Sequence, residues 1–67
     1  MISITVNGDP VEMAESATVK ILLEKIGVAG KRIAVELNGD IVPGSLHGTT
    51  NLNEGDILEV IQAIGGG

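Results

Sequence analysis

A single segment of this chain has the periodicity of a helix, and this limits the possible folds more than any other feature. Thr18 can cap the first turn through its hydroxyl group, and Gly27 can end the helix in a left-handed conformation. The pattern predicts a helix from residue 18 or 19 to residue 26, with one stripe that must be buried. The apolar residues of that stripe follow the spacing i, i+3, i+4, i+7: Val19, Leu22, Leu23 and Ile26.

The other apolar residues alternate with polar ones, which is the pattern of strands with one buried face. Two dipeptides, Asn7-Gly8 and Asn38-Gly39, favour tight hairpin turns because both residue types tolerate a positive φ. We therefore expect a hairpin at the start of the chain and a second, shorter one after the helix. The expected strands are residues 2–6, 10–13, 33–37, 41–42 and 57–64.

These elements predict an α+β fold. A lone helix has one stripe to bury, and a sheet needs one covered face, so we expect a mixed four- to five-stranded sheet with the helix packed across it. The first and last strands should be parallel neighbours in the middle, since such crossovers are right-handed. This order and length are those of the β-grasp, or ubiquitin-like, fold. Residues 45–52 are expected to form a loop or one helical turn, anchored by Leu46 and Leu52.

Composition excludes several classes of function. The 67 residues include no aromatic residue and no cysteine, so the core must be aliphatic and neither a disulfide nor a thiolate metal site can form. Nine acidic and four basic residues give a net charge of −5, which disfavours binding to nucleic acid. The longest apolar run is too short to span a membrane. The first residues lack the basic start of a secretion signal, and we expect a cytoplasmic protein.

The chain ends on Gly65-Gly66-Gly67. Glycine loses more backbone entropy on ordering than any other residue, so a folded domain gains little from three in a row. We expect a single domain over residues 1–64 and a thin, flexible tail over residues 65–67, whose terminal carboxylate can be threaded into the site of another protein. Taken alone, such a tail favours a frayed terminus or the remnant of a linker over a functional end.

The sequence also resembles a known family, the ThiS family of small ubiquitin-like sulfur carriers in thiamine (thiazole) biosynthesis. The resemblance covers essentially the whole chain. Its motifs support membership of the family because each occurs in the structural context that is expected for it. The segments that carry it are Thr18-Val19, Leu22-Leu23, Ala34-Val35-Glu36-Leu37-Asn38-Gly39, Ile41-Val42-Pro43, Leu52-Asn53-Glu54-Gly55-Asp56 and Gly65-Gly66-Gly67.

The resemblance implies a carrier that is not an enzyme and binds no cofactor itself. An adenylyltransferase similar to ubiquitin-activating enzymes would use ATP to activate the carboxylate of Gly67 as an acyl-adenylate. Sulfur from a persulfide donor would then replace AMP and leave a thiocarboxylate, which thiazole synthase would consume. Gly65 and Gly66 would form the tail that precedes this group. The residue chemistry agrees, because a chain without cysteine has no thiol on which to carry sulfur.

The open face of the sheet is the candidate docking surface. We expect Ile61 and Ala63 there, beside Glu59 and together with Val42. An ordinary scatter of exposed aliphatic side chains is the alternative.

The acidic residues around the last strand and the single histidine are not expected to be catalytic or metal-binding. Glu54, Asp56 and Glu59 are expected to form a solvated acidic face that could meet a basic partner. His47 is expected to be a surface-loop residue, because no cysteine or nearby acid suggests a metal site.

Three other functions remain open at this level. The small subunit of molybdopterin synthase shares the fold and the Gly-Gly end, although members of that family tend to be longer. A ubiquitin-like modifier would instead join Gly67 to a lysine of a target through an isopeptide bond. A plain β-grasp interaction module with an incidental tail is the third possibility.

Overall fold

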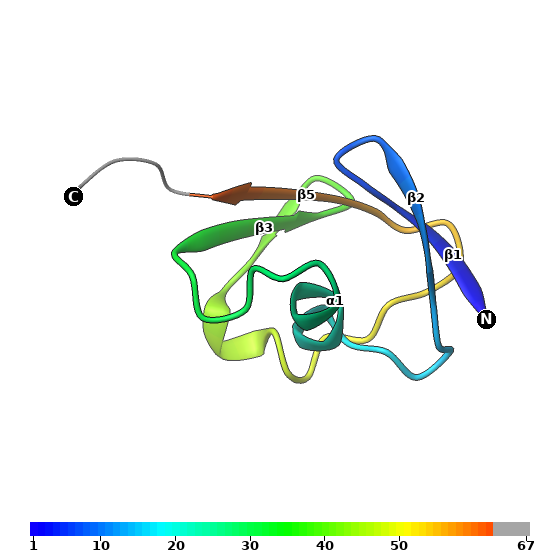
Figure 1. The fold of residues 1–67 in the computed structure, drawn as a ribbon, viewed down its shortest axis with the longest axis horizontal. Helices are drawn as coiled ribbons and strands as arrows, with labels where there is room; N and C mark the ends of the chain where they lie inside the picture. Colours follow the sequence, from blue (N-terminus) through cyan, green and yellow to red (C-terminus); the bar gives the residue numbers. More distant parts are fainter. Residues whose placement is uncertain (63–67) are drawn as a thin grey trace.

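The computed structural model describes residues 1–62. These residues form a five-stranded mixed sheet in the order β2-β1-β5-β3-β4, with one α helix packed across one face (Figure 1). This arrangement confirms the predicted β-grasp fold. The elements are β1 (Ile2–Val6), β2 (Asp9–Met13), α1 (Val19–Lys25), β3 (Ile33–Leu37), β4 (Asp40–Val42), the 3₁₀ helix η1 (Gly44–Leu46) and β5 (Ile57–Gln62).

The helix forms where the apolar stripe predicts it. The hydroxyl of Thr18 accepts a hydrogen bond from the backbone N–H of Ile21 at 3.3 Å, which satisfies one of the unpaired donors of the first turn. Gly27 follows the C-cap residue Ile26 with φ of +82°. Glycine adopts this left-handed conformation without steric strain, so it ends the helix as expected.

Two-residue turns set the register of both hairpins. Asn7 and Asn38 have φ of 50° and 52°, and the glycine after each is also at positive φ. Such turns match the right-handed twist of paired strands. In the second hairpin, Val35 is therefore opposite Val42.

The first and last strands are parallel neighbours at the centre of the sheet, as predicted. β5 also pairs antiparallel with β3 along five residue pairs. The strand that leads to the end of the chain is thus held on both sides.

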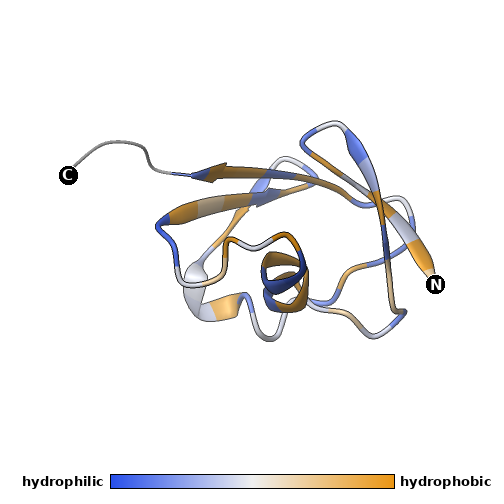
Figure 2. Ribbon diagram, viewed as in Figure 1, coloured by the Kyte–Doolittle hydropathy of each residue, from blue (hydrophilic) through white to orange (hydrophobic). Residues whose placement is uncertain are grey.

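The core lies between the sheet and the helix and is entirely aliphatic. Figure 2 shows apolar stretches along β5 and α1. The helix contributes three residues of its predicted stripe; the fourth, Ile26, is the C-cap residue and is exposed, so its predicted burial is wrong. Each strand contributes alternate residues, in agreement with the period-two pattern. The buried apolar residues are Ile2, Ile4, Val6, Met13, Ala17, Val19, Leu22, Leu23, Val35, Val42, Leu52 and Leu58.

The segment before β5 agrees with the prediction only in part. It contains the expected helical turn, η1, and Leu52 is fully buried. Leu46, however, is about half exposed and does not anchor the segment. Its backbone carbonyl accepts hydrogen bonds from the hydroxyl groups of Thr49 and Thr50 instead. Polar contacts to the turn therefore replace the second apolar anchor.

Candidate functional site

The end of β5 is the part of the described structure nearest in sequence to the glycines. Gln62 is opposite Ile33 of β3, so pairing continues to the last residue of the strand. Gly65, Gly66, Gly67 and Ala63 lie outside the described residues, and their predicted roles stay predictions.

A side chain extends the pairing of β5 on its other edge. Asn7 Nδ2 donates to the backbone carbonyl of Val60 at 3.1 Å, and Asn7 Oδ1 accepts from the backbone N–H of Val60 at 2.8 Å. These two bonds imitate the backbone pairing that β1 itself provides only at Thr5 and Val6. The Asn7 amide group thus holds β5 close to the point where the strand ends.

A second amide network holds the start of β5. Asp56 accepts from Asn38 Nδ2 at 3.0 Å and from the backbone N–H of Asn53 at 2.7 Å. Asn38 Oδ1 in turn accepts from the N–H of Ile57 at 2.9 Å. Asp56 is buried, so the prediction that it belongs to a solvated acidic face is wrong. Its carboxylate joins the turn before β5 to the β3–β4 hairpin.

Among residues 1–62, three large apolar side chains are exposed on the face of the sheet opposite the helix. Ile57 and Ile61 of β5 are each 57% exposed, and Ile41 of β4 is 64% exposed. Ile61 is opposite Ala34, so apolar surface continues onto β3. The prediction that Ile61 lies on the open face is confirmed.

Acidic residues lie between these isoleucines. Glu36 and Glu59 are directly opposite each other on β3 and β5, and Glu36 is also opposite Ile41. Like charges at directly opposed positions destabilise a sheet. A basic partner group placed between them would remove that cost. We call the surface formed by Ile41, Ile57, Ile61, Glu36 and Glu59 the open face.

Val42 does not belong to this surface. Its side chain is only 8% exposed and packs in the core, because the register places it opposite the buried Val35. The prediction that Val42 takes part in docking is therefore corrected. Ile41, the preceding residue, points to the opposite side of the strand. It was not predicted from the sequence to be part of the docking surface, and it occupies the position there that was predicted for Val42.

His47 is not a simple surface residue either. It is half-buried, and its Nε2 donates to the backbone carbonyl of Val42 at 3.0 Å. This bond ties η1 to β4. Within residues 1–62, no cluster of three or more His, Asp or Glu side chains could hold a metal ion. The described part of the chain also has no helix with the length and apolarity needed to cross a membrane.

Comparison with known proteins identifies the family. The model of the ThiS family matches residues 4–67. The chain belongs to the ThiS family. In agreement, the fold of this ThiS-family chain is similar to the crystal structure of a thiamine biosynthesis protein (ThiS) from Geobacter metallireducens. The TM-score is 0.82, with 36% identity over 98% of this chain and 100% of that one.

Two relatives of this ThiS-family chain contain the matching segment in proteins of different length. A thiazole synthase of Paramagnetospirillum magneticum is 41% identical over 64 residues, which is 96% of this chain but only 20% of the relative's own length. The uncharacterized protein ycf40 of Pyropia yezoensis is also 41% identical and is covered over 93% of its length. The same domain therefore occurs both as nearly a whole protein and as about a fifth of a longer one.

Proposed function

We propose that this ThiS-family chain is a sulfur carrier of thiamine biosynthesis and that the α-carboxylate of Gly67 carries the sulfur. The observation that carries this proposal is the family match, which begins at residue 4 and runs through residue 67, so that it includes the glycine end. The names of similar proteins, thiazole synthase and thiamine biosynthesis protein, favour thiamine over molybdopterin as the product.

The chemistry needs an activated carboxylate, because a free carboxylate is a poor electrophile. In the site of an adenylyltransferase, a carboxylate oxygen of Gly67 attacks the α-phosphorus of ATP, and pyrophosphate leaves. The terminal sulfur of a donor persulfide then attacks the carbonyl carbon of the acyl-adenylate, and AMP leaves. A thiol cleaves the resulting S–S bond, which leaves a disulfide on the donor side and a thiocarboxylate on Gly67. Thiazole synthase is the proposed acceptor of that sulfur.

In this scheme the chain is a carrier and not a catalyst. Its own role is to present the terminus, and the clamps at Asn7 and Asn38 support this by holding both ends of β5. The open face supplies apolar area for docking, and the opposed pair Glu36 and Glu59 suits a partner with basic side chains. We assign this face to the activating enzyme.

Blocking the terminus tests the proposal. The proposal requires a free carboxylate on Gly67, so deleting Gly67, or adding a short tag after it, should abolish the release of pyrophosphate from ATP by the cognate adenylyltransferase. The same tag placed before the exposed Met1 is the matched control and should leave the rate unchanged. Undiminished pyrophosphate release from the C-terminally tagged chain, with the tag shown to be intact, would contradict the role of Gly67.

A further inference from the structure

The basic side chains of this acidic protein are unevenly distributed. Three of its four basic residues, Lys20, Lys31 and Arg32, line one groove of about 550 Å³ on the helix side of the sheet. No acidic residue of the described part of the chain lines it. We call this feature the basic groove. In a chain with nine acids it is a region of opposite charge, built from α1, the segment before β3 and the turn after η1.

The walls of the basic groove are joined by backbone hydrogen bonds. The N–H of Lys20, in the first turn of α1, donates to the carbonyl of His47 at 2.9 Å, and that of Val19 donates to Thr50 at 3.0 Å. A Cβ atom at Gly48 would lie 3.9 Å from Cδ of Lys20, so the lysine stem runs close over the turn. These bonds fix the first turn of α1 against the turn that follows η1 on this side of the groove.

The basic groove lies at the end of the molecule from which the chain continues to Gly67. Arg32 precedes Ile33, which is opposite Gln62 at the end of β5. Five residues follow Gln62, and five residues span at most about 17 Å. A partner that holds Gly67 in its site must therefore bring the surface around that site close to Arg32. Arg32 also lines a second hollow, together with Ile61 of the open face.

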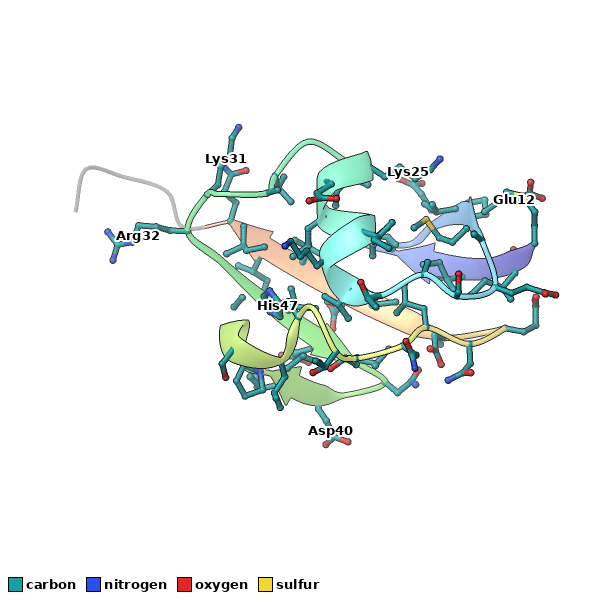
Figure 3. The ribbon with its side chains drawn as sticks, turned by 90° about the horizontal axis from the view of Figure 1, so that it is seen from below. Glu12, Lys25, Lys31, Arg32, Asp40 and His47 are labelled. Atoms are coloured by element: carbon teal, nitrogen blue, oxygen red, sulfur yellow. The ribbon has the colours of Figure 1, made fainter. Side chains whose placement is uncertain are left out.

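The side chains of the basic groove suit an extended acidic surface better than a small anion. Figure 3 shows Lys31 and Arg32 extending in different directions from adjacent positions, so they do not converge on one point. None of the side-chain hydrogen bonds among the described residues involves a lysine or an arginine. Their charges are available to meet carboxylates spread over a protein surface.

We infer that the basic groove is a docking surface for an acidic segment of the protein that receives the end of this chain. The inference rests on the proposed function, because it places the acidic segment beside the site that takes Gly67. The two charged surfaces then have different uses: the open face meets a basic partner surface, and the basic groove meets an acidic one. Charge complementarity of this kind speeds association and selects between partners.

Charge reversal with a matched control tests the inference. Lys31→Glu and Lys25→Glu change the net charge equally, but Lys25 lies outside the basic groove and lines a different hollow. Binding of each variant to the cognate thiazole synthase and the cognate adenylyltransferase would be measured by titration at low and high salt. Lys31→Glu should weaken binding to at least one partner by about tenfold at low salt. Lys25→Glu should change it by less than about twofold.

The salt dependence gives a second readout. The Debye length falls from about 10 Å at 0.1 M salt to about 3 Å at 1 M, so the difference between the two variants should shrink as salt is added. Thermal melting of each variant shows whether both remain folded. Both positions are exposed, and the melting temperatures should stay close to that of the unchanged chain.

Equal binding of both variants to both partners would overturn the inference and leave the proposed function intact, since binding requires no sulfur transfer. Saturable binding of inorganic phosphate or pyrophosphate in the basic groove, with partner affinity unaffected by Lys31→Glu, would also overturn it in favour of a small-anion site. Failure of the unchanged chain to form a thiocarboxylate would instead count against the proposed function alone, provided that the charge-dependent binding is observed.

Discussion

Replacing Asn7 with glycine should loosen β5 without straining the hairpin turn. The change removes two hydrogen bonds to Val60, of 3.1 and 2.8 Å. Each such bond contributes about 0.5–1.5 kcal/mol net, and these two are solvent-exposed, so the free energy of unfolding should fall by about 1–2 kcal/mol. Glycine keeps the positive φ of 50° at no steric cost. With a urea m-value of about 1 kcal/mol/M, the unfolding midpoint should fall by about 1–2 M.

A second substitution separates the hydrogen bonds from the backbone conformation. Asn7→Ala loses the same two bonds and must also hold a Cβ atom at positive φ, which adds roughly 1–2 kcal/mol. Amide hydrogen exchange at Val60 should be faster in both variants, because its N–H has lost its acceptor. If Asn7→Gly unfolds at the wild-type urea concentration and the exchange of Val60 is unchanged, the amide clamp has no energetic role and the reasoning is refuted.

Two further predictions separate the docking surface from the core. Ile61→Asp should weaken binding to the adenylyltransferase. It should change the free energy of unfolding by less than about 1 kcal/mol, because the side chain is mostly exposed. A collapse in thermal stability would show instead that Ile61 is a core residue. Val42→Ala should have the opposite effect. Its free energy of unfolding should fall by about 1–2.5 kcal/mol, because buried methyl groups are lost and a cavity remains, and its affinity for the partner should be retained. A large loss of affinity in a folded Val42→Ala variant would contradict its placement in the core.

The architecture could be predicted because each element has its own local signal. The stripe from Val19 to Ile26 identifies the helix, and the two Asn-Gly turns identify the hairpins. With one helix and one sheet, few arrangements bury both apolar faces. The parallel pairing of β1 with β5 then follows from the handedness of the crossover. Local and global preferences agree throughout the fold, which is what makes such a short chain predictable.

The open face could have been predicted more accurately from the same signals. A two-residue turn at Asn38-Gly39 fixes the register, so that Val42 must be opposite Val35 and share its buried face. Ile41 must then point to the open side. The turn rule, applied to the second hairpin, is therefore sufficient to assign Ile41 rather than Val42 to the docking surface.

The polar clamps could not be found in this way. Buried Asp56 accepts a hydrogen bond from Asn38, which is distant in sequence, and half-buried His47 donates one to Val42. These contacts depend on how the turn before β5 packs against the second hairpin. Neither the hydrophobic periodicity nor a local sequence motif predicts such tertiary contacts. The same holds for the basic groove, which collects Lys20 and Arg32 from separate elements.

The most direct test of the central claim is the intact mass of the chain after incubation with ATP, the cognate adenylyltransferase, a persulfide source and a thiol. The account predicts a gain of about 16 Da, the exchange of oxygen for sulfur, localised by fragmentation to Gly67. High-mass adducts joined to lysine would identify a protein modifier instead. An unchanged mass, with active adenylyltransferase confirmed in the same mixture, would contradict the carrier function.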